Sequence, residues 1–303
     1  MSKIVVIGSI NEDTSLRVHH FPTEGETIIA DAVSINNGGK GANQAVAAAR
    51  LGGSVAMIGA VGIDGSGRRM IADFQGEGID TQGIIQKQDQ TGFAIINVDQ
   101  QGHNNIVVYP GANHAISKED IDAHRHLIKD ADYCLIQFEI PMAVIEYAIM
   151  VCREYEVKVV LNPAPYSSSF NPQVLKDVAY FVPNEHEFAS SIGSNIDFNT
   201  VDEFELKKVA ESFVTEYQCN LIVTLGVRGS LLATPTKFVV VDAIQTQAVD
   251  TTAAGDTYIG ALTSQLSQSI DIDEAMKYAS KAAALTVSKM GAQTSIPYKK
   301  DLT

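Results

Sequence analysis

The sequence predicts an α/β protein: a Rossmann-like α/β/α sandwich with a mainly parallel central sheet and a small β-sheet lid. Strand-like and helix-like segments alternate along most of the 303 residues, which is typical of a parallel sheet covered by helices on both faces. The first strand, Ile4–Ile7, is a continuous apolar run, as expected for a strand buried on both faces. Two insertions, about 12–37 and 91–112, hold turn residues and short strand-like pieces. We therefore expect one domain, 1–303, with a lid formed by these insertions.

Composition narrows the class of function. The net charge of −14 leaves no basic surface for nucleic acid or for an anionic membrane, although metal ions and backbone amides can still neutralise a bound nucleotide. The three cysteines, Cys134, Cys152 and Cys219, have no zinc-finger or CxxC spacing. The apolar N-terminal run is too short for a signal peptide, and no apolar stretch has transmembrane length. We expect a cytoplasmic protein without a membrane or nucleic-acid partner.

Polar residues follow the first strand. Asn11, Glu12 and Asp13 come just after its carboxyl end, where open α/β sheets bind ligands. The same residue types also form polar turns in which Asn and Asp bond to their own backbone. Both interpretations remain open for this segment.

A glycine-rich bend at 37–44 precedes an alanine-rich helix that ends near Gly52. Lys40 is not a P-loop lysine, because Gly41 follows it where Ser or Thr is required. The segment is either a glycine-backed site that presents Lys40 and Asn43 to a ligand at a helix start, or an ordinary bend with a surface lysine. No GxGxxG motif is present, which disfavours a nicotinamide oxidoreductase.

The remaining elements follow in order. A hairpin is expected at 93–98 and 105–109, around the turn 99–102. Further strands are expected at 55–61, 133–137, 158–162, 180–182 and 221–225, and helices near 141–155, 200–217 and 272–290.

Polar residues recur where the later strands end. In a doubly wound sheet these ends share one edge. Glu139 is either a ligand contact or a helix N-cap, and Thr224 begins a glycine turn between two strands. Asn184 and Glu187 could hold a hydrated Mg²⁺, since Mg²⁺ keeps waters and takes few carboxylates, or they could cap a helix.

The segment Val249–Tyr258 combines a strand end, a turn of small residues, Asp256 and a helix start. Bare backbone N–H groups and the positive end of the helix dipole make such a turn an anion site. A carboxylate beside developing negative charge is unfavourable unless it handles a proton, which indicates proton abstraction next to phosphoryl transfer.

Taken together, several motifs resemble the ribokinase-type carbohydrate kinases: Gly38–Gln44, Asn162–Pro165, Asp250–Asp256 and Gly291–Pro297. The resemblance implies ATP-dependent phosphorylation of ribose at its 5-hydroxyl, on an α/β/α domain whose β lid often forms a dimer. A kinase for another small sugar, such as 2-deoxyribose or fructose, is an alternative, as is a non-catalytic sugar-binding regulator with the same fold.

The resemblance also implies roles for individual residues. Asp256 would be the base, and the amides of Ala253, Ala254, Gly255 and Asp256 would form an anion hole. The sugar site would comprise Asn11, Glu12, Asp13, Gly39, Lys40, Gly41, Ala42, Asn43 and Glu139, together with Asp256.

ATP would lie against Asn184, Glu187, Thr224, Leu225, Gly226, Val227, Arg228, Gly229, Gly255, Asp256 and Ser280, with Glu187 linked to Mg²⁺ and phosphate. A K⁺ ion would take the side chain of Asp250, the carbonyls of Thr252, Thr286, Lys289 and Gly291, and Ser295.

Overall fold

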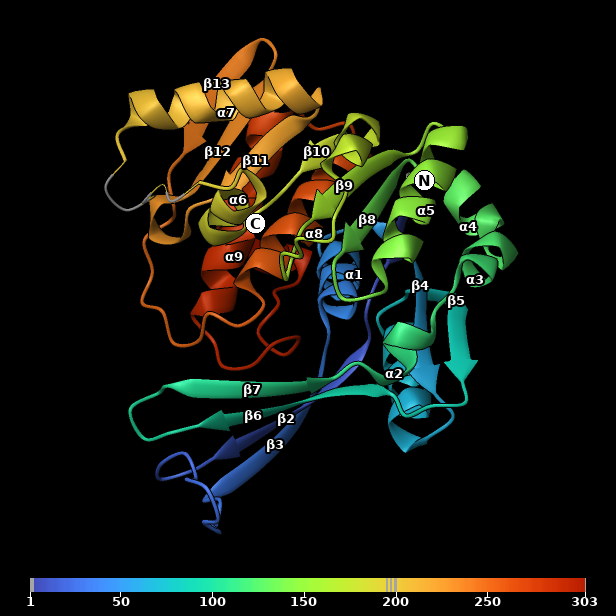
Figure 1. Ribbon diagram of the computed structural model, residues 1–303, viewed down its shortest axis with the longest axis vertical. Helices are drawn as coiled ribbons and strands as arrows, with labels where there is room; N and C mark the ends of the chain where they lie inside the picture. The colour runs from blue at the N-terminus through green and yellow to red at the C-terminus, as the bar shows by residue number, and fades with distance from the viewer. Residues whose placement is uncertain (1–2, 195, 197, 199–200, 303) are drawn as a thin grey trace.

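The structure, a computed structural model, describes residues 3–194, 196, 198 and 201–302. Within these residues the strands form a nine-stranded sheet and a separate four-stranded sheet. Figure 1 shows the larger sheet between two layers of helices, with the smaller sheet extending away from it.

The central sheet is mainly parallel, as predicted. Its order is β13 (Lys237–Val241), β12 (Ser230–Thr234), β11 (Asn220–Thr224), β10 (Tyr180–Phe181), β9 (Lys158–Asn162), β8 (Tyr133–Gln137), β1 (Lys3–Ile7), β4 (Ser54–Gly62), β5 (Asp80–Lys87). All pairings from β5 to β11 in this order are parallel, whereas β12 and β13 add on antiparallel. Strand β5 is not among the predicted strands.

The apolar run of β1 explains its central place in the sheet. Ile4 to Ile7 are each 0% exposed. Because side chains alternate along a strand, Ile4 and Val6 join one apolar core and Val5 and Ile7 join the other. The two cores lie on opposite faces of the sheet, which confirms the predicted sandwich.

Two sets of helices cover these cores. One core includes residues of α1 (Lys40–Arg50), α2 (Gly65–Gly76), α8 (Ala254–Ser267) and α9 (Ile272–Val287). The other includes residues of α3 (Lys118–Ala123), α4 (Arg125–Lys129), α5 (Met142–Glu154), α6 (Glu185–Ser191) and α7 (Glu203–Tyr217). Residue 200, the expected start of α7, lies outside the described residues. Among the described helices none is long and apolar enough to cross a membrane.

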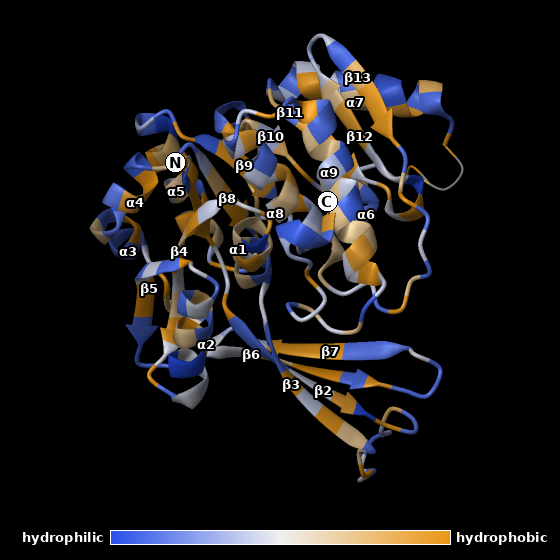
Figure 2. Cartoon of the chain, turned by 180° about the vertical axis from the view of Figure 1, so that it is seen from behind, coloured by the Kyte–Doolittle hydropathy of each residue, from blue (hydrophilic) through white to orange (hydrophobic). Residues whose placement is uncertain are grey.

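The small sheet has the order β3 (Ala32–Gly38), β2 (Asn11–Arg17), β6 (Gly92–Val98), β7 (Asn104–Tyr109). Strands β6 and β7 form the predicted hairpin, and β2 lies parallel to β6. This sheet carries exposed apolar side chains, among them Val33, Ile35 and Val107 at 63%, 58% and 66% exposure. Apolar stretches are visible along its strands in Figure 2.

Candidate active site

Asp256 lies in the first turn of α8 and is only 7% exposed. The chain turns into this helix through Ala253, whose φ of +60° is uncommon for a residue with a Cβ. No side chain caps the helix, and among the described residues nothing accepts the amide hydrogens of Gly255 and Asp256. A Cβ on Gly255 would meet nothing within 4 Å. The helix start therefore presents free N–H donors to open space, as an anion site requires.

Two side-chain amides of α1 hold the Asp256 carboxylate. Asn43 Nδ2 donates to Oδ2 at 3.0 Å, and Gln44 Nε2 donates to Oδ1 at 3.0 Å. Gln44 is 0% exposed. It also donates to Asn162 Oδ1 at 3.1 Å and accepts from Gln137 Nε2 at 2.7 Å. This buried chain of amides fixes one orientation of the carboxylate.

Gln44 and Gln137 are site residues that the sequence reasoning missed. The position of Gln44 directly after Asn43 was the available signal. Close packing of α1 on α8 brings the side-chain amides of Asn43 and Gln44 to Asp256. The two helices touch at Gly260, where a Cβ would lie 2.6 Å from Ala47 Cβ and 2.8 Å from the Gln44 carbonyl oxygen.

The glycines around the start of α1 allow backbone to pack on backbone. A Cβ on Gly41 would lie 2.6 Å from Ser9 N, and one on Gly38 would lie 1.9 Å from Asp13 Oδ2. Gly39 has a φ of +86°, which favours glycine. The Ala42 amide donates to the Ser9 carbonyl at 2.9 Å. Gly41 and Ala42 thus contribute backbone packing at the end of β1.

Glu139 closes the start of α1 rather than capping the helix that follows it in the sequence. Its Oε2 accepts the Lys40 amide at 2.9 Å and the Ser9 hydroxyl, whereas the N-cap position of α5 is Pro141. Glu139 therefore ties the lysine-bearing turn to the end of β1.

Asn11 and Asp13 lie on one face of β2, and Glu12 lies on the other because side chains alternate. Asn113, another residue that the sequence reasoning missed, donates to Asn11 Oδ1 at 2.7 Å and accepts from Ile10 N at 2.9 Å. It is 1% exposed and orients the Asn11 side chain.

The prediction that Glu12 belongs to the sugar site needs correction. Its carboxylate accepts from Ser66 Oγ at 2.6 Å and from Arg69 Nη2 at 2.5 Å, both on α2. Although burial opposes it, these two partners lower the pKa of Glu12. Glu12 links β2 to α2 and faces away from Asp13.

The side chain of Lys40 lies among carboxylates. Burial favours its neutral form, but Asp256 and Glu139 outweigh burial and raise the pKa of Lys40, with smaller effects from Glu187 and Asp13. Burial, with Glu139 and Asp256 nearby, raises the pKa of Asp13 to about 7. Burial also raises the pKa of Glu187. The predicted Asp13, Lys40, Glu139, Glu187 and Asp256 therefore form one charged group.

Asn184 and Glu187 make a reciprocal capping box at the start of α6. Asn184 Oδ1 accepts from Glu187 N at 2.8 Å, and Glu187 Oε2 accepts from Asn184 N at 2.9 Å. The capping interpretation is therefore confirmed. Glu187 nevertheless has a half-buried side chain that interacts electrostatically with Lys40 and Asp256, so its role extends to the charged group.

The glycine turn 224–229 follows β11. Asn184 and Thr224 pair as a parallel bridge, which places the turn beside α6. Gly226 and Gly229 have φ values of +53° and +90°, and the Leu225 amide bonds to the Gly229 carbonyl at 2.8 Å. Of the other predicted nucleotide contacts, Val227 is exposed, Arg228 bonds to the Phe198 carbonyl, and Ser280 is buried in α9.

The segments predicted to hold K⁺ lie side by side. Asp250 Oδ2 accepts from Gly291 N at 2.9 Å, and Val249 N donates to the Val287 carbonyl at 2.7 Å. Against the effect of burial, hydrogen bonds from Thr252 and Gly291 lower the pKa of Asp250, so it stays a carboxylate.

The donor set of these segments suits a hard cation. Within the described residues, the carbonyls of Thr252, Lys289 and Gly291 accept no hydrogen bond, while that of Thr286 accepts from Lys289 N at 3.1 Å. Ser295 is 0% exposed. One carboxylate with several free carbonyls matches the oxygen ligands of such cations. The described part of the chain has no cluster of three or more His, Cys, Asp or Glu that could hold a metal, so carbonyls would supply most ligands here.

A model of the pfkB family of carbohydrate kinases matches residues 1–299. The chain belongs to the pfkB carbohydrate kinase family. This pfkB kinase is 38% identical to the ribokinase of Haemophilus influenzae over 98% of its own length and 96% of that protein. It is 40% identical to a bifunctional ribokinase/ribose-5-phosphate isomerase A of Fructilactobacillus sanfranciscensis, of which it spans 55%.

The fold of the pfkB kinase agrees with a solved relative. The structure of Arabidopsis thaliana ribokinase complexed with ribose and ATP superposes with a TM-score of 0.92 at 28% identity, covering 100% of this chain and 98% of that one. The predicted family and fold class are thus confirmed.

Proposed function

We propose that the chain transfers the γ-phosphoryl group of ATP to the 5-hydroxyl of D-ribose, giving ribose 5-phosphate and ADP. The observation that carries this proposal is the placement of Asp256. A buried carboxylate, held by two amides, lies at a helix start whose N–H groups are free. A sugar hydroxyl beside the carboxylate would lose its proton to Asp256 while its oxygen bonds to the γ-phosphorus of ATP. The bond from that phosphorus to the β-phosphate oxygen then breaks and ADP leaves, with the backbone N–H groups stabilising the charge on the transferred phosphoryl oxygens.

The chemistry follows from this arrangement. Each oxygen of the Asp256 carboxylate accepts one amide hydrogen and keeps a lone pair for the hydroxyl proton. Phosphoryl transfer needs little base strength because its transition state is loose, so positioning and charge stabilisation dominate. The amides of Gly255 and Asp256, with the positive end of α8, would stabilise the phosphoryl oxygens.

The charged group around Lys40 supports the sugar assignment. Asn11, Asp13 and Glu139 offer acceptors, while Asn43 and Lys40 offer donors, which together suit vicinal hydroxyls. Gly39 adds backbone close to Asn11, since a Cβ there would lie 2.9 Å from Asn11 N. Glu12 is not part of this proposal because it faces α2.

Two cations complete the proposal. Mg²⁺ bound to ATP would neutralise phosphate charge, and Glu187 would hold its hydration shell. Its Oε2 is bonded to Asn184 N, and its carboxylate interacts electrostatically with Lys40. K⁺ would lie between Asp250 and the carbonyls of Thr252, Lys289 and Gly291, where it adds positive charge near the anion site.

We further propose a homodimer formed through the small sheet. Its exposed Val33, Ile35 and Val107 are an apolar surface of the kind that marks an interface. Light scattering after size exclusion should give twice the chain mass, and Val107→Glu should give a monomer.

The free, buried thiols of Cys134, Cys152 and Cys219 favour a cytoplasmic location, since the cytoplasm keeps thiols reduced.

The direct test is Asp256→Asn in an assay of ADP release with ribose. Loss of a general base lowers rates by about 10²–10⁴-fold, so we expect at least a 10²-fold lower kcat with ATP binding retained. Full activity would refute the role of Asp256.

A comparison of kcat/KM for ribose, 2-deoxyribose and fructose would identify the preferred sugar acceptor. Sugar binding without turnover would favour a regulator. The K⁺ site predicts a higher kcat in KCl than in NaCl, and equal values would contradict it.

A further inference from the structure

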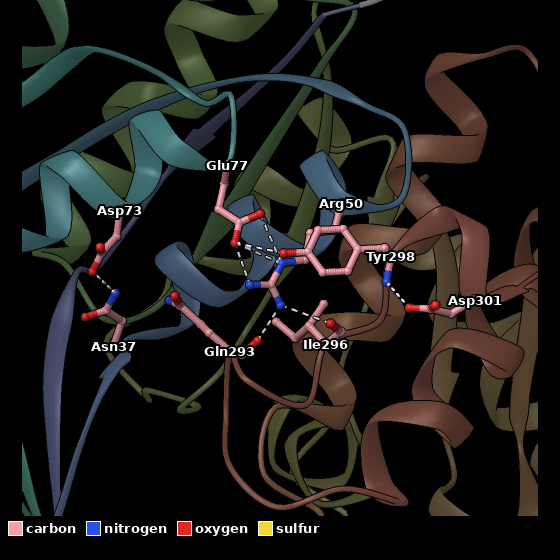
Figure 3. Close-up of polar contacts among 8 residues, drawn as sticks. All are labelled: Asn37, Arg50, Asp73, Glu77, Gln293, Ile296, Tyr298 and Asp301. Carbon is pink, nitrogen blue, oxygen red and sulfur yellow. Dashed lines mark hydrogen bonds and ion pairs between the residues drawn. The ribbon is translucent and has the colours of Figure 1, made fainter.

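Arg50, the last residue of α1, joins three parts of the chain (Figure 3). Its Nε and Nη2 bond to both oxygens of Glu77, at 2.5 to 3.1 Å. Its Nη1 donates to the carbonyls of Gln293 at 2.5 Å and Ile296 at 3.0 Å. The guanidinium also lies over the ring of Tyr298, with Cζ 4.7 Å from the centroid. The side chain is only 12% exposed.

The two carbonyls belong to the loop 291–297, which is mostly buried although it has no helix or strand. Ala292, Gln293, Ser295 and Ile296 are each 8% exposed or less. Buried backbone carbonyls need donors. The Ala292 carbonyl accepts from Ser295, and Arg50 supplies the donor for the carbonyls of Gln293 and Ile296. The loop therefore depends on Arg50 for its conformation.

This loop carries Gly291 and Ser295, two of the residues proposed to bind K⁺. The opposite end of α1 carries Asn43 and Gln44, which hold Asp256. A single helix therefore has the base-holding amides in its first turns and the loop-holding arginine at its end. If the loop 291–297 shifted, its bonds to Arg50 would pull on α1, the helix that positions Asp256.

Helix α2 extends the connection to the small sheet. Glu77, the C-cap residue of α2, holds Arg50. The same helix bonds to β3 through Asp73 and Asn37 at 2.7 Å, and to β2 through Arg69 and Glu12. Arg50 thus lies where the small sheet, through α2, meets the loop 291–297.

We propose that Arg50 is a positioning residue for K⁺ binding: it holds the loop 291–297 so that Gly291 and Ser295 face Asp250. This inference rests on the K⁺ site of the proposed function. Arginine is required because one planar guanidinium must donate to a carboxylate and to two carbonyls at once, a fork geometry that lysine lacks. A lysine at position 50 would keep the positive charge but could not make all of the hydrogen bonds to Glu77 and to the two carbonyls.

The test compares Arg50→Lys with Arg153→Lys. Arg153 is a matched control because it is also a helix arginine in an ion pair, with Asp177 at 3.1 Å, far from the loop in sequence. Tm would be measured against KCl at constant ionic strength, with choline chloride as the balancing salt, in the presence and absence of ADP. Hydrogen exchange of a peptide covering 288–297 would be followed with and without K⁺.

We expect Arg50→Lys to raise the K⁺ concentration at half-maximal stabilisation by about tenfold or more, equivalent to about 1.4 kcal/mol. Exchange of 288–297 should be faster in this variant even in K⁺, while Arg153→Lys matches the wild type in both measurements. Glu77→Gln, which frees one side of the guanidinium, should give an intermediate midpoint.

An Arg50→Lys variant with the wild-type K⁺ midpoint and wild-type exchange would overturn the role of Arg50. A wild-type Tm that does not rise when KCl replaces choline chloride would instead overturn the K⁺ site, and the inference with it. If Arg50→Lys does not fold, the Glu77→Gln midpoint decides: an unchanged value contradicts the proposal.

Discussion

Replacing Gln44 by Met would remove the inner support of Asp256 with little change in volume. The variant loses the bond to Asp256 Oδ1 and the bond to Asn162 Oδ1, and it leaves Gln137 Nε2 without its acceptor. Gln137 is 0% exposed, so water cannot replace its lost acceptor. The carboxylate would keep only the bond from Asn43.

The expected size of the effect follows from these contacts. A hydrogen bond to a charged group contributes about 1.5–3 kcal/mol. If that bond keeps Asp256 in its reactive orientation, its loss should lower kcat by about 10- to 100-fold, since 1.36 kcal/mol corresponds to a factor of ten. The KM of ribose should change much less, because Asn11, Asp13 and Glu139 are untouched.

The assay is steady-state ADP release with ribose and ATP varied, together with urea unfolding. Val46→Ala is the matched control: Val46 is 1% exposed, lies on the same helix and touches the apolar core. Its truncation should also destabilise the fold by about 1–3 kcal/mol. If Gln44→Met and Val46→Ala lose stability alike and keep the same kcat, the amide chain does not position the base.

Three further changes test the site. Gly41→Ala would place a Cβ 2.6 Å from Ser9 N, so we expect a lower Tm and loss of sugar binding by calorimetry; wild-type values would contradict the packing argument. Glu12→Gln should leave the KM of ribose within about twofold, whereas Asp13→Asn should raise it; the reverse order would restore Glu12 to the site. The pKa of Asp13, raised by burial from 3.8 to about 7, means that the folded state binds more protons than the unfolded state between these values. This residue therefore makes the free energy of unfolding fall as pH rises from 4 to 7, and Asp13→Asn should flatten that slope in urea titrations; an unchanged slope would refute this.

The fold was predictable where local patterns and burial agree. The run Ile4–Ile7 is buried on both faces, so its composition alone indicates a central parallel strand. Strand β5 escaped prediction because Asp80–Lys87 is mostly polar and lies at the edge of the sheet, where one side of the strand has no neighbour. Its sequence resembles a loop until the pairing with β4 is known.

The site was predictable only in part, for a similar reason. Asp256 and Asn43 lie in recognisable motifs, but Gln137 has no motif and reaches the site through Gln44. Glu12 follows Asn11 in the sequence, and only the alternation of a strand reveals that it faces α2. Arg50 was not predicted because its partners lie 27 and more than 240 residues away.

The net charge of the chain does not indicate whether it binds an anionic nucleotide, because the groups that would bind the phosphate are backbone N–H groups. The chain carries −14 overall, and Lys40 interacts electrostatically with the carboxylates of Asp256, Glu139, Glu187 and Asp13. Positive potential for a phosphate arises instead from the free amides at the start of α8 and from its dipole, which no count of charged residues includes. An acidic chain can thus bind ATP at a point where backbone, rather than side chains, supplies the donors. The same carboxylates that would repel a phosphate accept hydroxyl groups, so in the proposed function the sugar would lie against these side chains and the phosphate against the backbone N–H groups.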